Sequence, residues 1–343
     1  MVDVTIRGAG IFGLSIAWAC AKRGARIKLI DPNGAGSGSS GGVVGALAPH
    51  VPENWNLKKA FQLDSLIMAS EFWSEVETTG GVASGYTRSG RVQPIYDEAA
   101  LDIAKRRAVT ARALWKHHAT WKVETCSGCV WGPLSPTGWF IRDTLSAHLH
   151  PASACAALVA ALAAKGINIK AQGTNQGRVL WATGVDGLAQ LNEGRDRSVG
   201  TGVKGQAALL DYSAPGAAQI FANAVHIIPH LDGTVAIGST SELEYDDPHS
   251  VDAQIDEIIA KARQAVPMLQ NAPVLRKWAG VRPRARSRAP MLGEWPGRTG
   301  HYIANGGFKI GFGMAPKISE VMADLLLEDR NEIPQGFEVN ASF

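Results

Sequence analysis

The sequence predicts an α/β fold that begins with a βαβ unit, and three observations lead to this prediction. Residues 3–7 and 26–30 are short apolar segments typical of strands, and residues 14–23 between them carry apolar side chains at helical spacing. A glycine motif of the form Gly-x-Gly-x-x-Gly joins the first strand to the helix: Gly8, Gly10 and Gly13. Asp31 ends the second strand. This order of strand, glycine turn, helix, strand and acidic residue is typical of a Rossmann-type dinucleotide-binding domain.

Each residue of the motif has its own expected role. Gly8 allows the tight turn, Gly10 lets a pyrophosphate approach the backbone, and Gly13 permits close packing of the helix on the strand. The N-terminus of the helix would face the phosphates. Asp31 would accept a hydrogen bond from a ribose hydroxyl. The alternative, a glycine-rich turn without a ligand, is disfavoured because the motif stands in the required context.

Composition and charge exclude several classes of protein. Of the 343 residues, 45% are hydrophobic, which is too high for a globally disordered chain. The net charge of +3 is too small to imply a nucleic-acid or membrane partner. No stretch of 18 or more apolar residues predicts a transmembrane segment, and the N-terminus lacks the features of a secretory signal, so we expect a cytoplasmic protein. The four cysteines are too few for a disulfide framework.

The remaining pattern predicts helices and antiparallel sheet. Helices are expected over 57–77, 97–117, 151–165, 251–265 (with Ser250 as its cap) and 316–328. Strand-like segments lie at 90–96 and 178–182. Residues 204–240 alternate like antiparallel strands, with a hairpin at Asp232-Gly233. Cys126 and Cys129 form a lone Cys-x-x-Cys, for which a hairpin corner is favoured over a metal or redox site.

Three further segments carry candidate chemistry. The Gly/Ser-rich arm at residues 34–45 indicates a large cofactor that needs a second line of contacts, the alternative being a flexible surface loop. The glycine-rich loop at residues 305–316 delivers a helix N-terminus, whose partial positive charge could stabilise a reduced cofactor. Arg282 precedes a proline in an apolar strand, where its planar guanidinium suits a carboxylate. The alternative for Arg282 is a surface arginine.

Together these segments resemble the D-amino-acid oxidase superfamily of FAD-dependent oxidoreductases, with glycine oxidase and D-amino-acid dehydrogenase-like members most similar. The resemblance runs along the whole chain. Intermediate segments also match it: Ser39-Ser40, residues 45–49, Lys204-Gly205-Gln206, residues 226–229, Asp232-Gly233 and residues 238–240.

The resemblance implies a discontinuous FAD-binding domain (1–48, 137–195 and 276–343) and an α+β substrate domain on an antiparallel sheet (49–136 and 196–275). It implies noncovalent FAD, because no cysteine follows Cys155 to anchor it. The expected cofactor contacts are Gly8, Gly10, Ile11, Phe12, Gly13, Asp31, Pro32, Ser39, Ser40, Ala46, Leu47, Thr183, Gly184, Gly306, Gly307, Phe308, Lys309 and Ile310.

The resemblance further implies oxidation of an amino acid or related amine at its Cα–N bond, with hydride transfer to the flavin. The substrate would be glycine, a D-amino acid or an N-substituted glycine, and oxygen or a quinone would reoxidise the flavin. Arg282 would bind the substrate carboxylate, and Tyr245 is a further candidate in the site. The sequence leaves a homo-oligomer open.

Several alternatives remain at this point. Arg284, Arg286 and Arg288 could share a strand face with Arg282 and favour an acidic substrate, or they could form a solvated edge. His148-Leu149-His150 lacks further ligands nearby in sequence, so no metal is expected. The chain could also be an oxidase related to tRNA wobble modification, although its low charge argues against this. A non-catalytic FAD-binding sensor or assembly protein is the third alternative, and the retained Arg282 argues against it.

Overall fold

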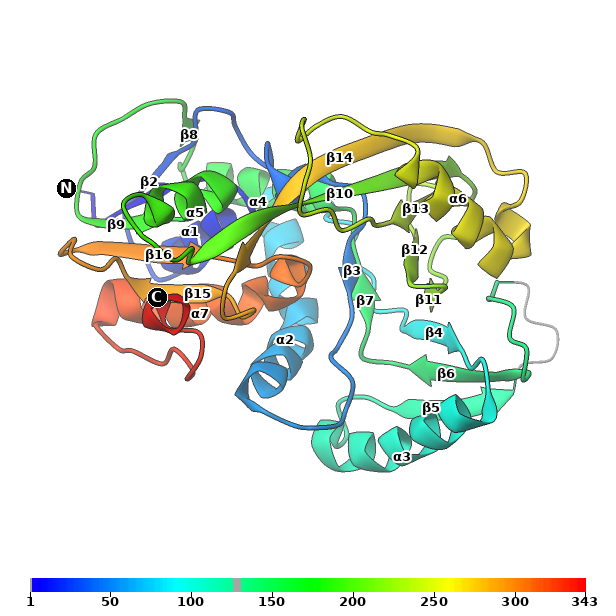
Figure 1. Cartoon of the computed structure of the whole chain (residues 1–343). Coiled ribbons are helices and arrows are strands. Elements are labelled where there is room, and N and C mark those ends of the chain that lie inside the picture. Colours follow the sequence, from blue (N-terminus) through cyan, green and yellow to red (C-terminus); the bar gives the residue numbers. More distant parts are fainter. Residues whose placement is uncertain (1, 126–130) are drawn as a thin grey trace.

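The computed structural model describes residues 2–125 and 131–343, so the Cys126–Cys129 motif lies outside the described residues. A six-stranded, an eight-stranded and a two-stranded sheet are surrounded by helices (Figure 1). The predicted α/β class and the N-terminal βαβ unit are confirmed.

The six-stranded sheet contains the βαβ unit. β1 pairs in parallel with both β2 and β9, β9 pairs in parallel with β16, and β15 closes one edge in antiparallel orientation. Because the carboxyl ends of parallel strands meet at one edge, the segments that follow β1, β9 and β16 adjoin there. In spatial order the strands are β15 (Met291–Glu294), β16 (His301–Asn305), β9 (Arg178–Trp181), β1 (Val4–Arg7), β2 (Ile27–Ile30) and β8 (Ile169–Lys170).

Four helices pack together beside this sheet: α1 (Ile11–Lys22), α2 (Leu57–Gly80), α4 (Pro151–Ala164) and α7 (Gly311–Glu328). Every residue of α1 from Ile11 to Ala21 is buried. A helix that is buried on all sides must be apolar on all sides, which explains why its sequence shows little amphipathic contrast. In the described part of the chain, no helix is long and apolar enough to cross a membrane.

The eight-stranded sheet is antiparallel except where β4 runs parallel to β11. Its outer helices are α6 (Gln254–Ala265), which packs on β10, β12 and β13, and α3 (Glu98–Trp115), which packs on β5. In spatial order the strands are β14 (Val274–Ala285), β10 (Gly200–Asp211), β13 (Thr234–Gly238), β12 (Val225–Pro229), β11 (Gln219–Ala222), β4 (Arg91–Pro94), β6 (Trp139–Asp143) and β5 (Trp121–Thr125).

The smaller elements connect the two large sheets. They are the 3₁₀ turn η1 (Ser39–Gly41), the helix α5 (Gly184–Asn192) and the paired short strands β3 (Ala46–Leu47) and β7 (Ala147–His148). β6 and β14 belong to the eight-stranded sheet, although the sequence grouped residues 137–195 and 276–343 with the cofactor. The residue-level domain boundaries stay a prediction.

Two helix starts differ from the sequence expectation. α7 begins at Gly311 rather than Pro316, which lies inside the helix. The proline removes one N–H from the second turn, but the helix keeps its packing against α1 and α2. α6 begins at Gln254 after Ala253, and Ser250 does not cap it. The Ser250 hydroxyl instead accepts a hydrogen bond from Lys204 Nζ, at 3.3 Å.

Candidate active site

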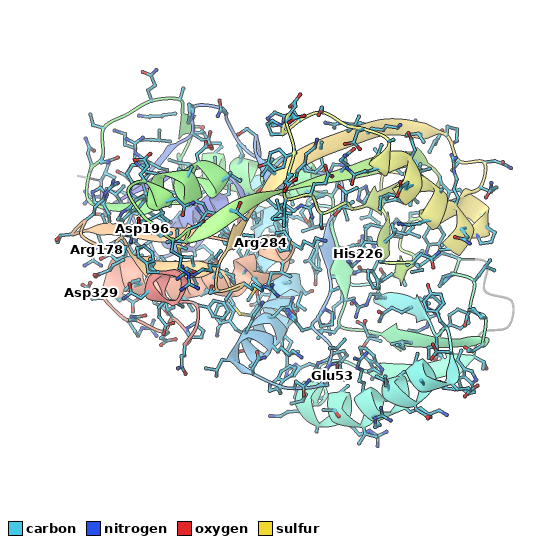
Figure 2. The ribbon with its side chains drawn as sticks, viewed as in Figure 1. Glu53, Arg178, Asp196, His226, Arg284 and Asp329 are labelled. Atoms are coloured by element: carbon cyan, nitrogen blue, oxygen red, sulfur yellow. The ribbon has the colours of Figure 1, made fainter. Side chains whose placement is uncertain are left out.

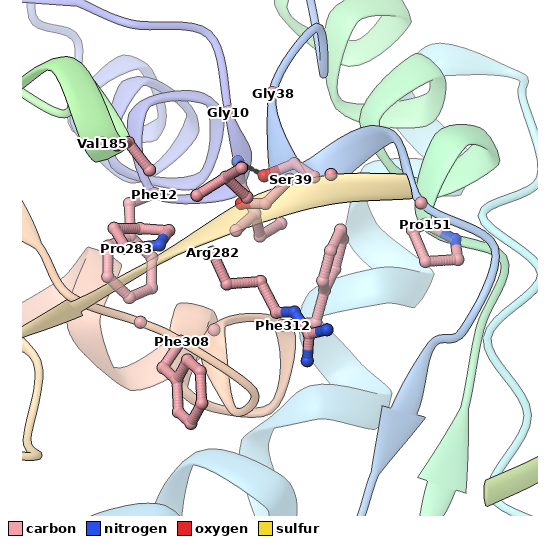
Figure 3. Close-up of a pocket in the computed structure, with 18 of the residues that line it drawn as sticks. Gly10, Phe12, Gly38, Ser39, Pro151, Val185, Arg282, Pro283, Phe308 and Phe312 are labelled. Atoms are coloured by element: carbon pink, nitrogen blue, oxygen red, sulfur yellow. Dashed lines mark hydrogen bonds between the residues drawn. The ribbon is translucent and has the colours of Figure 1, made fainter. Parts of the chain in front are cut away.

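A cavity of about 1320 Å³ lies where the ends of the two large sheets meet. Its walls come from segments far apart in sequence: the β1–α1 turn, the Gly/Ser-rich arm, residues 181–186, β14 and the loop before α7. The close-up in Figure 3 shows Gly10 and Ser39 on one side of this cavity and Phe308 and Phe312 on the other. The volume is sufficient for a dinucleotide rather than for a small metabolite alone.

The glycine turn is shaped by close backbone contacts. Gly8 has a φ of +101°, and a Cβ there would lie 2.3 Å from the Ala182 carbonyl oxygen. A Cβ on Gly13 would lie 1.8 Å from the carbonyl oxygen of Gly8. Gly13 does not line the cavity; it lets α1 approach the turn, as the motif predicts, while Gly8 and Gly10 do line it.

Asp31 and Ser40 fix the two segments that flank the turn. Asp31 accepts the Ala9 N–H on Oδ2 at 2.7 Å, so the second strand holds the turn in place. Ser40 Oγ accepts the Ile11 N–H at 3.0 Å, which ties the Gly/Ser-rich arm to the first residue of α1. The arm is therefore part of the cavity wall rather than a free surface loop.

Arg282 projects from β14 into the cavity. Its guanidinium donates from Nη1 to Ser239 Oγ at 3.2 Å and from Nη2 to the Thr240 carbonyl at 3.0 Å. In the described part of the chain it forms no ion pair, although the side chain is 91% buried. Figure 3 shows the side chain reaching toward Phe312 and past Phe308. Burial lowers the pKa of Arg282 to about 10, so the group stays charged at neutral pH.

Glycine at position 205 makes room for this arginine. β10 runs beside β14, and a Cβ on Gly205 would lie 1.1 Å from Arg282 Nη2. The residues on each side of Gly205 anchor the loop that Arg282 contacts, because the N–H of Gln206 donates to Thr240 Oγ1 at 2.8 Å and Lys204 forms a buried ion pair with Glu242. The Lys204-Gly205-Gln206 segment therefore has a structural role, because it makes room for Arg282 and anchors the loop that Arg282 contacts.

The loop before α7 packs against the glycine turn and the start of α1. Its Phe308 N–H donates to the Pro283 carbonyl at 3.0 Å, which joins the loop to the strand that carries Arg282. A Cβ on Gly307 would lie 2.8 Å from the Phe12 ring, so the loop also rests on α1. Lys309 lines the cavity, and burial together with the nearby Arg282 charge lowers its pKa.

Tyr245 and His226 also line the cavity. A Cβ on Gly202 would lie 2.8 Å from the Tyr245 hydroxyl, so a larger residue at position 202 would clash with Tyr245. His226 lies near the middle of the molecule, whereas the Arg178–Asp329 ion pair lies at an outer edge (Figure 2). Burial lowers the pKa of His226 to about 3, with smaller effects from Arg91 and Lys309, so its imidazole is neutral at neutral pH.

The other arginines of this strand region do not join Arg282. Arg284 is half-buried beside Phe308 and does not line the cavity. Arg286 donates to the Phe343 and Ser198 carbonyls, and Arg288 is exposed. This placement supports the solvated edge among the two alternatives.

Nearly all the residues predicted to contact the cofactor line the one cavity. They are Gly8, Gly10, Ile11, Phe12, Asp31, Pro32, Ser39, Ser40, Ala46, Leu47, Thr183, Gly184, Gly306, Gly307, Phe308, Lys309 and Ile310. Sequence reasoning missed Trp181, Val185, Phe221 and His249, which also line it. No motif marks these four; Trp181 and Phe221 are ordinary strand residues in the sequence pattern, and only tertiary structure brings them to the cavity.

Solved structures share this fold. The crystal structure of glycine oxidase from Geobacillus kaustophilus superposes with a TM-score of 0.82 at 21% identity, covering 98% of each chain. The crystal structure of iminodiacetate oxidase from Chelativorans sp. gives a TM-score of 0.82 at 19% identity, covering 97% of each chain.

Sequence comparison identifies the family. A bifunctional protein ThiO/ThiG from Nostoc sp. is 25% identical over 358 residues, covering 96% of this chain. This chain spans 53% of the length of that relative. The family model DAO, described as FAD dependent oxidoreductase, matches residues 3–325. With its glycine turn, arm and C-terminal loop gathered around one cavity, the chain belongs to this family of FAD-dependent oxidoreductases.

Proposed function

We propose that the protein oxidises the Cα–N bond of glycine, a D-amino acid or an N-substituted glycine, using noncovalent FAD as the hydride acceptor. The observation that carries this proposal is Arg282, a buried cation that faces the cavity without a carboxylate partner in the described residues. Burial lowers the pKa of Arg282, and the Glu242 carboxylate raises it without an ion pair to Arg282, since Glu242 is paired with Lys204. A buried guanidinium without a direct ion-pair partner is costly, and the carboxylate of an amino acid would supply one.

The cavity fits the cofactor that the family implies. Gly10, the N-cap of α1, provides no side-chain cap, and Ser40 accepts only the Ile11 N–H, so the following N–H groups of the first turn would face the phosphate groups. Asp31 lies beyond the end of β2, where its carboxylate oxygens can also accept from a ribose hydroxyl. The loop at residues 306–310 lines the same cavity and would hold the ring system. FAD supplies a two-electron acceptor when it is bound there.

The residues of the chain then act mainly by positioning. Arg282 anchors the carboxylate, which fixes Cα and directs its hydrogen toward the ring side of the cavity. The amine would react in its neutral form. Hydrogen leaves Cα with the bonding electron pair as a hydride transferred to FAD, and the nitrogen lone pair forms C=N. Water hydrolyses the resulting iminium ion to the oxo acid and the released amine or ammonium. Arg282 stays charged throughout, since its pKa of about 10 lies above the working range. Tyr245, which lines the same cavity, would donate a hydrogen bond to the substrate.

The similar proteins support the proposed substrate range. One solved structure is named glycine oxidase and another iminodiacetate oxidase, so both names describe a glycine or an N-substituted glycine as substrate.

Visible absorption spectra test this proposal. The purified protein is mixed anaerobically with glycine, sarcosine, iminodiacetate and a panel of D-amino acids. We expect at least one to bleach the flavin and to yield the corresponding keto or glyoxylic acid. Subsequent addition of oxygen or of a quinone identifies the acceptor. A yellow protein that none of these amines bleaches would contradict the proposed activity.

A further inference from the structure

Three potential metal ligands converge away from the flavin cavity. His150 precedes α4, while His230 and Asp232 lie in the β12–β13 hairpin about 80 residues further along the chain. One potential ligand atom from each of the three side chains lies within 4.8 Å of the other two. The two imidazole rings have their centroids 4.7 Å apart at an angle of 60°.

The hydrogen bonds of these side chains leave donor atoms available for a cation. Asp232 Oδ1 accepts from both the N–H and the hydroxyl of Thr234, at 3.1 and 2.7 Å, which orients the carboxylate and leaves Oδ2 without a partner in the described part of the chain. His230 is 98% buried, and its Nε2 has no hydrogen-bond partner among the described residues. Such an atom is unfavourable unless a ligand satisfies it.

The three side chains also lie close together without hydrogen-bonding one another. Their hydrogen bonds run instead to neighbouring residues. His150 Nδ1 accepts the Ser153 N–H at 3.4 Å, while His230 Nδ1 and Asp232 Oδ1 both contact the Thr234 hydroxyl. A polar cluster that stabilised the fold on its own would pair its members directly. Convergence without mutual pairing is the arrangement expected of ligands that share a central ion.

We propose that His150, His230 and Asp232 form a binding site for a divalent transition-metal ion such as Zn²⁺. Two imidazoles and one carboxylate are a recurrent ligand set for zinc, and water would complete the tetrahedron. Ligand atoms at about 2.0–2.1 Å from zinc lie about 3.4 Å from one another, so the cluster has to contract by roughly an ångström. Asp232 is exposed and lies in the same hairpin turn as Thr234, so a shift of this turn would provide the movement while the Thr234 hydrogen bonds are kept.

Such a site would connect the two sheets. His150 lies between β7 and α4, α4 contacts η1 of the cofactor arm, and His230 directly follows β12 of the eight-stranded sheet. Pro151, the residue after His150, lines the flavin cavity. A bound ion would thus cross-link the hairpin to the helix start beside the arm. We infer a structural role, because none of the three ligands lines the flavin cavity, whereas Arg282 and the loop at residues 306–310 do.

Metal titration of the holoenzyme tests the site. The chelator-treated, FAD-loaded protein is titrated with Zn²⁺ alone by calorimetry, and retained zinc is counted after dialysis. We expect the wild type to bind one Zn²⁺ per chain with a dissociation constant below about 10 µM. Asp232→Asn and His230→Ala should each raise this dissociation constant about tenfold or more. Asp232→Asn keeps the Oδ1 acceptor for Thr234 and is exposed, so it remains informative if His230→Ala fails to fold.

Two control variants separate this site from other candidates. His117→Ala/His118→Ala removes another pair of adjacent histidines, which are exposed and stack on each other. Cys126→Ser/Cys129→Ser removes the Cys-x-x-Cys. Both controls should retain full zinc binding. Absence of stoichiometric zinc in the wild type would overturn the proposal, and so would zinc binding that Asp232→Asn leaves intact. Flavin reduction by amines is measured separately, so failure here does not bear on the proposed oxidase activity.

Discussion

Arg282 is the residue on which the proposed chemistry depends most directly. Its guanidinium is held at two points, by Ser239 and Thr240, and this leaves part of its fork to meet a planar carboxylate. Position 205 must be glycine for the fork to lie where it does. Recognition of the substrate therefore depends on a pair of positions on neighbouring strands rather than on a single side chain.

Replacing Arg282 should reduce catalytic efficiency. Arg282→Met removes a charge-assisted interaction worth about 1.5–3 kcal/mol, so we expect kcat/KM to fall about 10- to 150-fold, mainly through KM. Steady-state kinetics with the best substrate of the spectral assay would measure this. The matched control is Arg288→Met. Arg288 is exposed and lies outside the cavity, so this variant should keep the wild-type kcat/KM. Equal kcat/KM values for Arg282→Met and the control would contradict the proposal that Arg282 binds the substrate carboxylate.

His226 should make the stability of the protein depend on pH. Burial, together with the nearby positive charges of Arg91 and Lys309, lowers its pKa from 6.5 to about 3. Below pH 6.5 the unfolded chain binds a proton that the folded protein does not, so the free energy of unfolding falls as pH decreases toward 3. The slope is at most about 1.4 kcal/mol per pH unit.

The variant His226→Phe should remove this contribution, with its ring placed against Phe221. Urea unfolding midpoints of the wild type and the variant, measured between pH 4 and 8, give the difference. We expect the two curves to run parallel above pH 6.5, and the wild type to lose stability relative to the variant as pH falls from 6.5 toward 4. Curves that stay parallel below pH 6.5 as well would show that the folded state protonates His226 normally.

At the scale of elements, the β1–α1 turn is the most tightly constrained part of the cofactor site. A Cβ on Gly13 would overlap the Gly8 carbonyl oxygen, although the backbone of Gly13 itself is ordinary. Gly13→Ala should therefore push α1 away from β1, destabilise the protein by about 3 kcal/mol or more, and reduce FAD retention. Thermal unfolding and the ratio of flavin to protein absorbance would report both effects.

The control for this variant is Gly24→Ala, at the other end of α1. Gly24 has a positive φ of +83° but no atom within 4 Å of the added Cβ. The control should cost only the backbone strain, about 1–2 kcal/mol, and leave the FAD content unchanged. Loss of FAD in both variants to the same extent would mean that general destabilisation, rather than the turn, governs cofactor binding.

Local sequence patterns predicted which elements form better than they predicted the residues at which those elements begin. The βαβ unit was predictable because its spacing, glycines and acidic residue all lie within about 30 residues, and the fingerprint has a direct physical cause. The start of α7 was not, because Gly311 and Gly313 are poor helix formers and Pro316 is a common first-turn residue. Packing of this helix against α1 and α2 overrides that preference.

At the scale of the molecule, the order of the eight-stranded sheet could not be read from the sequence. The parallel pairing of β4 with β11 joins residues 91–92 to residues 219–220, and no local periodicity encodes such a contact. The same limit applies to His150, His230 and Asp232. His148-Leu149-His150 is visible as a short motif, but its proposed partners lie in a distant hairpin.

Cofactor binding should stabilise the whole molecule, because the cavity wall is built from both large sheets. A ligand that binds only the folded state adds about 2.7 kcal/mol at a concentration of 100 times its dissociation constant. We expect FAD added to the cofactor-stripped protein to raise the melting temperature in a concentration-dependent way. FMN, which lacks the adenosine half that the Gly8 turn and Asp31 would hold, should raise it much less. Equal shifts with the two flavins would place the cofactor outside the glycine turn.

The contact between Gly8 and Ala182, and the adjoining positions of β1, β9 and β16, have a consequence for the growing polypeptide on the ribosome. The fingerprint turn is synthesised well before β9 and β16, which emerge some 170 and 300 residues later. At about 5–20 residues per second, the turn waits at least about 15 s for β16. Flavin loading should therefore follow synthesis of residues 301–305, and nascent fragments that carry the intact fingerprint but lack β16 should not retain FAD.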